Sequence, residues 1–134
     1  MKKKLVSIII NCYNGEKYLR DTLESVKSQT FKNYEVIFFD NCSTDQSANI
    51  FKSFKDKRFK YFKTTKKISL YKSRNLALKK CKGNFITFLD ADDWWEKNFL
   101  ISRKKFFDSQ KIYGFSFSNC FHYFQKKKNY QKFL

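Results

Sequence analysis

The 134-residue sequence contains no proline, three glycines and one histidine, and its 12 acidic residues are outnumbered by 29 basic ones. One histidine and four widely separated cysteines, with no C-x-x-C pair, exclude a zinc ribbon. No apolar run approaches the roughly eighteen residues of a membrane span. The hydrophobic content of 42% and the aromatic content of 20% exclude a disordered chain. We therefore expect one folded domain whose cysteines are free thiols.

The shortage of acids leaves a net charge of +17, which is compatible with binding to nucleic acid or to an anionic membrane. However, Lys, Asn, Ile, Phe and Tyr all have AT-rich codons, and a genome biased toward A and T would produce the same skew. The lysines are also spread along the chain. Charge by itself is weak evidence for a ligand.

The basic start of the chain, Met1–Lys4, is followed by an apolar run over Leu5–Ile10. That run is too short for the core of a signal peptide, and no small-residue cleavage site follows it. We therefore expect a cytoplasmic protein.

The run around which the sequence is organised is Phe85–Leu89, five mostly apolar residues that end at Asp90-Ala91-Asp92-Asp93. So short an apolar run predicts a strand buried on both faces. Ligands of open α/β sheets bind outside the carboxyl ends of the strands. Crowded carboxylates there favour Mg²⁺ or Mn²⁺ shared with substrate phosphates. The alternative is a solvated turn in which Asp93 caps the next helix, and the local pattern leaves both possibilities open.

Strand-like and helix-like segments alternate along the chain, which predicts an α/β fold with a doubly wound sheet. The expected strands are Leu5–Ile10, Tyr34–Phe39, Arg58–Phe62, Phe85–Leu89 and Tyr113–Phe117. The expected helices are Glu16 to about Gln29, a helix capped by Ser43 or Thr44, Ser69–Cys81 with Leu70, Tyr71, Ala77 and Leu78 inward, and Trp95–Gln110. We expect residues 1–124 to form the domain and residues 125–134 to form a basic, frayed tail.

Polar clusters follow three of these strands, at Asn11–Asn14, Asp40–Asp45 and Asp90–Asp93. Clusters at three strand ends are harder to explain as separate helix caps, and they favour a nucleotide-like ligand with a metal. Arg74 falls on the apolar face of its helix and therefore needs a partner. That partner is either a structural carboxylate or a phosphate in the crevice.

Four motifs in this order resemble those of family 2 glycosyltransferases and cover roughly residues 5 to 100. They are Val6–Asn14 with Leu23–Phe31, then Tyr34–Asp45, Ser73–Ala77 and Gly83–Asp93. A lone D-x-D would be weak, whereas four motifs at the right spacing are specific. The resemblance implies a GT-A fold, a doubly wound and mostly parallel sheet with helices on both faces. It also implies a glycosyltransferase of the inverting, hexosyltransferase type, which moves a sugar from a nucleotide diphosphate to a glycan or lipid acceptor in cell-surface polysaccharide synthesis.

The resemblance also implies roles for single residues. Asn11 and Tyr13 would line the base pocket, Asp40 and Asn41 would contact base and ribose, and Arg74 would approach the nucleotide. Asp90-Ala91-Asp92 would be the D-x-D motif, with Asp92 and Asp90 holding Mn²⁺ or Mg²⁺ against the phosphates of the donor, by preference a UDP-sugar. Contact with an anionic membrane at its inner face fits a lipid-linked acceptor.

Two departures from the family pattern bear on activity. Many members have a second acid and then glycine where this chain has Asn41-Cys42. The family's catalytic base lies in a later, acceptor-binding half, on which side this chain looks truncated. The acids after Asp93, Glu96 and Asp108, both fall in the helix of the donor half, so we expect no competent base and no transfer unless another chain completes the site.

Two other functions stay open. A basic, aromatic-rich nucleic-acid-binding module would show steep salt dependence and indifference to divalent metal. A nonfunctional remnant would expose an apolar face, aggregate and bind no ligand.

Overall fold

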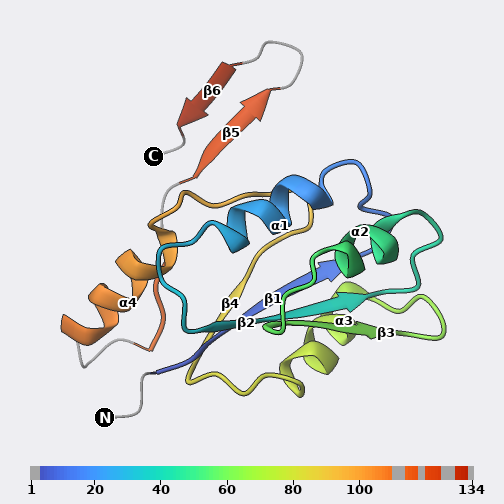
Figure 1. Ribbon diagram of the computed structural model, residues 1–134, viewed down its shortest axis with the longest axis horizontal. Coiled ribbons are helices and arrows are strands. Elements are labelled where there is room, and N and C mark those ends of the chain that lie inside the picture. The colour runs from blue at the N-terminus through green and yellow to red at the C-terminus, as the bar shows by residue number, and fades with distance from the viewer. Residues whose placement is uncertain (1–3, 110–113, 118–119, 125–128, 133–134) are drawn as a thin grey trace. The chain divides into compact units, whose positions relative to one another are not determined.

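The computed structural model describes residues 4–109, 114–117, 120–124 and 129–132 (Figure 1). The chain divides into two compact units, residues 1–101 and residues 102–134. The elements in chain order are β1 (Val6–Cys12), α1 (Leu19–Lys27), β2 (Tyr34–Asp40), α2 (Ser47–Ser53), β3 (Phe59–Lys63), α3 (Leu70–Leu78), β4 (Phe85–Phe88), α4 (Phe99–Ser109), β5 (Phe121–Phe124) and β6 (Asn129–Lys132).

The first unit is built on a parallel four-stranded sheet in the order β3-β2-β1-β4. The two central strands are the most apolar segments of the chain, and β2 is buried along its whole length. Because every strand runs in the same direction, all four carboxyl ends lie at one edge of the sheet. The α/β fold predicted from the alternation of segments is confirmed.

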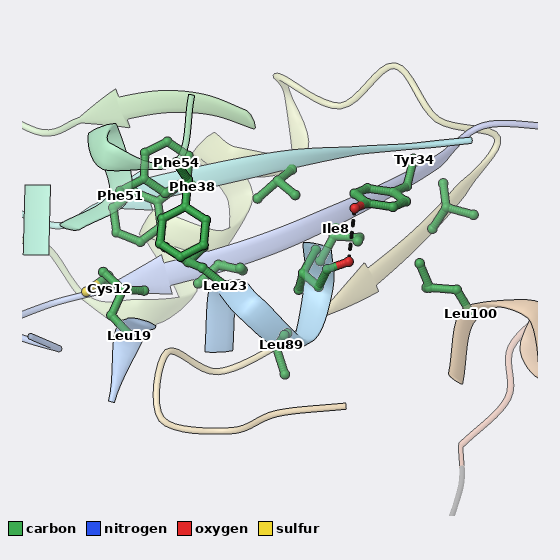
Figure 2. Close-up of a cluster of buried hydrophobic side chains, with 14 residues drawn as sticks. Ile8, Cys12, Leu19, Leu23, Tyr34, Phe38, Phe51, Phe54, Leu89 and Leu100 are labelled. Carbon is green, nitrogen blue, oxygen red and sulfur yellow. Dashed lines mark hydrogen bonds between the residues drawn. The ribbon is translucent and has the colours of Figure 1, made fainter. Parts of the chain in front are cut away.

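One face of the sheet packs against α1 and α2. Ile8, Ile10 and Phe38 from the central strands meet Leu23 and Phe51 from the helices (Figure 2). The Tyr34 hydroxyl, buried in the same cluster, donates to the Val26 carbonyl oxygen at 2.9 Å. Burial raises the pKa of Tyr34 to about 12, so the hydroxyl keeps its proton and remains a donor.

The opposite face of the sheet packs against α3. Ile9, Ile37 and Phe39 contact Ala77 of this helix, and Ser73 one turn earlier is also fully buried. Helices therefore cover both faces, as predicted. The expected inner face of α3 was partly wrong, because Leu70 and Tyr71 are exposed. Small side chains let the helix approach the sheet closely.

Strand β4 differs from the expectation that it is buried on both faces. It pairs with β1 and forms an edge of the sheet among the described strands. Ile86 and Phe88, on the face that turns toward α3, are 46% and 44% exposed. An apolar run alone does not distinguish a central strand from an edge strand whose outer face is open.

Helix α4 begins at Phe99 and not at Trp95, so Asp93 is not its N-cap. The preceding segment is held in an irregular conformation against α1. The Trp95 amide donates to the Ser25 hydroxyl at 3.2 Å, and the Trp95 ring stacks on Phe99. These tertiary contacts replace the first turn of the expected helix.

The second unit contains an antiparallel pair, β5 with β6. The strand expected at Tyr113–Phe117 is wrong for residues 114–117, which are irregular, and Tyr113 lies outside the described residues. Four residues of the expected frayed tail form β6, whereas the domain boundary at residue 124 stays a prediction. Among the described residues, no helix is long and apolar enough to cross a membrane.

Candidate functional site

The loops after β1 and β2 are joined to each other at the carboxyl edge of the sheet. The Asn14 amide donates to the Ser43 hydroxyl at 3.0 Å, and the Thr44 amide donates back to Asn14 Oδ1 at 2.9 Å. Further along, the Glu16 amide donates to Asp45 Oδ2 at 3.0 Å. Burial raises the pKa of Asp45, but hydrogen bonds led by that from the Ser47 hydroxyl outweigh it and lower the pKa. These hydrogen bonds join the two loops into one rim at the carboxyl ends of the strands.

Asn11 and Tyr13 leave the end of β1 in different directions. Asn11 donates from its amide nitrogen to the hydroxyl of the buried Ser73 on α3, at 2.7 Å. Tyr13 is 45% exposed, and the ammonium of Lys67 lies 3.6 Å from the centre of its ring. Asn11 therefore holds α3 in place, whereas Tyr13 offers an open aromatic face at the rim.

Asp40 ends β2 and is completely buried. Its Oδ1 accepts from the Ser43 amide at 2.7 Å, and its Oδ2 accepts from the Tyr61 hydroxyl of β3 at 2.5 Å. Burial, and then the hydrogen bond to Asp40, raise the pKa of Tyr61 and keep this donor protonated. The carboxylate of Asp40 is thus used to shape the loop after β2, and it does not reach the surface.

Asn41, the next residue, anchors the loop between β3 and α3. Its Nδ2 donates to the Ile68 carbonyl oxygen at 2.7 Å, and its Oδ1 accepts from the Ile68 amide at 2.9 Å. This two-way bond to a backbone fixes the chain two residues before α3 begins. Cys42 then adopts a positive φ of 68°, the conformation for which glycine is favoured.

Arg74 lies against the acidic motif. Its Nη2 is 3.0 Å from Asp90 Oδ1, both side chains are partly exposed, and the guanidinium also stands 5.5 Å from the Phe88 ring centre. The partner that Arg74 required is thus the first carboxylate of the D-x-D motif. An exposed pair of this kind contributes little to stability, so it is free to reorganise around a ligand.

The acidic motif forms a turn whose backbone is hydrogen-bonded to helix α1. The Asp93 amide donates to the Asp90 carbonyl oxygen at 3.1 Å, and the Ala91 carbonyl oxygen accepts from the Thr22 hydroxyl on α1 at 2.9 Å. The side chains of Asp90 and Asp92 are exposed. The described residues contain no group of three metal-binding side chains. Two open carboxylates one residue apart still fit a cation that takes its other ligands from phosphates and water.

Comparison with known proteins identifies the family to which a chain with this site belongs. A family model described as Glycosyl transferase family 2 matches residues 7–133. The chain belongs to glycosyl transferase family 2. This membership favours a sugar-transfer function over the nucleic-acid-binding alternative.

Relatives of this family 2 chain are considerably longer than the chain. The chain is 40% identical over 118 residues to the Escherichia coli UDP-Glc:alpha-D-GlcNAc-diphosphoundecaprenol beta-1,3-glucosyltransferase WfaP. The aligned region covers 88% of this chain and 47% of WfaP. It is 34% identical over 118 residues to the Bacillus subtilis protein TuaG, described as a teichuronic acid biosynthesis glycosyltransferase, over 87% of this chain and 46% of TuaG. The chain thus spans about half the length of these curated relatives.

Solved structures agree on the fold of this family 2 chain. The crystal structure of Staphylococcus aureus TarS in complex with UDP matches with a TM-score of 0.74 and 35% identity, over 78% of this chain and 32% of that one. A mannosyltransferase from Pyrobaculum calidifontis, in complex with GDP-Man and Mn²⁺, matches with a TM-score of 0.73 at 21% identity, over 80% and 33% of the two chains. The fold is GT-A, as the resemblance implied.

Within this family 2 domain, the residues named from the sequence fall into two groups. Tyr13, Arg74, Asp90 and Asp92 present side chains at the carboxyl edge, whereas Asp40 and Asn41 are buried and support the loops. Sequence reasoning missed the partners that do the supporting, namely Tyr61, Ile68 and Ser73, together with Lys67 over Tyr13. These partners come from other elements, and apart from Ser73, which begins the third motif, no local pattern marks them.

Proposed function

We propose that this chain binds a nucleotide-diphosphate sugar at the carboxyl edge of its sheet, as the donor part of a family 2 glycosyltransferase. The observation that carries the proposal is the Arg74–Asp90 pair beside the open Asp92 carboxylate. The Arg74 guanidinium thus lies close to the Asp90 carboxylate, and Asp92 belongs to the same turn. The Tyr13 ring lies on the same rim of loops. A diphosphate, a metal and a planar base are the ligand parts that such groups bind.

Each group has a role in the proposed complex. The Tyr13 ring stacks on the base, and Arg74 turns from Asp90 toward a phosphate. Asp92, with Asp90, holds Mn²⁺ or Mg²⁺, which when bound offsets the charge that develops on the departing diphosphate. In the contacts described above, Asn11 positions α3, whereas Asp40, Asn41 and the Ala91 backbone position the loops around the site. The donor contacts that the family resemblance implies for Asn11, Asp40 and Asn41 stay predictions.

The donor and the acceptor follow from the relatives. WfaP is named for UDP-Glc and for a diphosphoundecaprenol-linked acceptor, and TarS crystallises with UDP. We therefore propose a UDP-sugar as donor, and a glycan or lipid-linked acceptor in cell-surface polysaccharide synthesis. The cytoplasm, at the inner face of the membrane, is the compartment that suits both.

The reaction proposed for the whole enzyme is inverting transfer. Such transfer needs a base to deprotonate the acceptor hydroxyl. We assign no such base among the described residues, because Asp108 pairs with Lys104 within α4 and no contact joins the Glu96 side chain to Arg74, Asp90 or Asp92. Donor binding is accordingly the part of the reaction that we propose for this chain by itself.

The test is calorimetric titration of the chain with UDP and with other nucleoside diphosphates, with and without Mn²⁺. We expect UDP to bind more tightly with Mn²⁺, and Asp92→Asn to weaken that binding by about tenfold or more. Glu24→Gln removes the same charge from the exposed surface of α1 and should leave the affinity unchanged. Failure of a folded sample to bind any nucleotide, or equal effects of the two substitutions, would overturn the proposal.

A further inference from the structure

The positive charge of this chain is concentrated in one continuous stretch. Between Lys57 and Leu89 there are eleven lysines and arginines and no aspartate or glutamate, whereas the preceding 56 residues contain nine basic and seven acidic residues. The stretch forms the two outer strands of the sheet, β3 and β4, and the helix between them in the chain, α3. The lysines are spread along the chain, but the acids that would balance them are not.

Helix α3 lies on the sheet face opposite α1 and α2 (Figure 1), and it carries two of these lysines on its outward side. Its Ser73 and Ala77 face the sheet, so the outward side of the helix consists of Tyr71, Lys72, Asn75, Leu76 and Lys79, which we call the α3 outer face. Tyr71 is 64% exposed and Leu76 is 39% exposed. A large aromatic side chain and a leucine thus stand beside two lysines in open solvent.

The donor site does not account for this face. Arg74 uses the side of α3 that turns toward Asp90, and Lys67 lies over Tyr13. Lys72 and Lys79, in contrast, make no ion pair with any carboxylate in the described part of the chain. Packing does not account for the face either, because Tyr71 and Leu76 are not part of the hydrophobic core.

The chemistry of the α3 outer face fits a lipid surface. Exposed lysines bind anionic headgroups, tyrosine suits the interface between headgroups and acyl chains, and leucine adds apolar area. A second copy of the chain fits poorly, because it would bring the same unbalanced positive charge to the contact. The position also suits a transferase, because α3 begins just after Ile68, which Asn41 holds at the rim of the donor site.

We infer that the α3 outer face rests on an anionic membrane surface, assisted by Lys66, Lys80 and Lys82 beside the ends of the helix. The inference deepens the proposed function and rests on it, because it names the surface through which a donor domain would meet a lipid-linked acceptor. Contact along α3 would leave the Arg74–Asp90 pair beside the membrane and open to a nucleotide.

The test is sedimentation of the chain with vesicles of phosphatidylcholine, and with vesicles of phosphatidylcholine and phosphatidylglycerol in equal parts. We expect binding only to the anionic vesicles. The double variant Lys72→Gln, Lys79→Gln should lower the partition coefficient by about thirtyfold, at roughly 1 kcal/mol for each lysine near the surface. The matched control Lys32→Gln, Lys55→Gln loses the same charge elsewhere and should stay within about twofold of the wild type.

The apolar part of the contact is tested by Tyr71→Ser, Leu76→Ser, which keeps the charge and should also lower binding to anionic vesicles. Equal losses in both lysine pairs, binding to neutral vesicles, or a preference for a single-stranded oligonucleotide over vesicles would overturn the inference. UDP titration of the same variants separates the two proposals, because none of these substitutions touches the donor site. Vesicle binding without UDP binding would leave the membrane surface intact and remove the donor site.

Discussion

Two non-glycine residues of the described chain have a positive φ, and they differ in the contacts that stabilise this backbone conformation. Asn14, at 52°, is a residue that tolerates the left-handed region, and its side chain accepts from the Thr44 amide. Cys42, at 68°, gains only a long contact of 3.8 Å from its sulfur to the Thr65 carbonyl oxygen. Cys42 therefore holds backbone strain that Asn14 does not.

We predict that Cys42→Gly raises the free energy of unfolding by about 0.5 to 1 kcal/mol. Relief of the left-handed strain exceeds the added flexibility of the unfolded chain. Urea denaturation would measure the change as a higher midpoint at an unchanged slope. Asn14→Gly is the matched control and should lower stability by about 1 kcal/mol, because it removes a bond between the two loops. A destabilised Cys42→Gly variant would show that the thiol contact matters more than the strain.

Single residues also show how far the site could be foreseen. Arg74 was predicted to need a partner because its helix places it on an inner face, and it found Asp90. The burial of Asp40 could not be foreseen, because it depends on the Tyr61 hydroxyl, and Tyr61 lies 21 positions later in a strand with weak alternation. Local spacing reports a helix face or a strand end, whereas it says nothing of which distant side chain fills the space beside it.

Among the elements, strands β1, β2 and β3 share one buried carboxylate. Glu35 accepts from the Ser7 hydroxyl at 2.7 Å, from the Lys60 ammonium and from the Lys82 amide at 2.6 Å. Burial raises the pKa of Glu35, but these hydrogen bonds, led by that of Lys60, outweigh it and hold the pKa below the usual 4.5. Gly83 belongs to the same junction, because a side chain there would meet the Ser7 amide nitrogen at 2.6 Å.

We predict that the stability contributed by Glu35 is fully present above about pH 4.5 and is lost as the pH falls through its lowered folded-state pKa. The sign follows because the unfolded state binds the proton more readily than the folded state. Urea denaturation between pH 7 and pH 3 should therefore show a shallower fall for Glu35→Gln than for the wild type. Ser7→Ala removes one of the three bonds and should give an intermediate slope. Parallel curves for all three proteins would contradict the role of Glu35, while Asp45 and Asp56 would still contribute in the same direction.

The elements differ in how well the sequence predicts them. The central strands β1 and β2 were clear because burial on both faces leaves an uninterrupted apolar run. Strand β4 has a similar run, yet it is an edge strand, because its position depends on which strand pairs beside it. The start of α4 was missed because Ser25 and Phe99 hold Trp95 outside the helix. Contacts between distant segments decided each of these differences.

The molecule as a whole combines a high net charge with an open sheet edge. Among the described strands none pairs with the outer edge of β4, and the Ile86 and Phe88 side chains are exposed on the face of this edge strand that turns toward α3. Edge strands of this kind pair readily with other chains unless a charge blocks them. The net charge of +17 opposes such pairing at a distance, since two copies repel each other. Salt screens this repulsion, but it does not weaken the hydrophobic contact that the exposed side chains of β4 can make with another copy.

We therefore predict that the chain is monomeric at low ionic strength and self-associates through β4 as salt is added. The screening length falls from about 30 Å at 0.01 M to about 3 Å at 1 M, which removes the long-range repulsion but not the edge contact. Sedimentation velocity at both salt concentrations would detect the change. Ile86→Lys places a charge on the edge and should keep the chain monomeric, whereas Leu70→Lys makes the same change at an exposed leucine of α3 and should not. If both variants associate alike, the contact lies elsewhere. If the wild type stays monomeric in high salt, the β4 edge is too short or too twisted to pair.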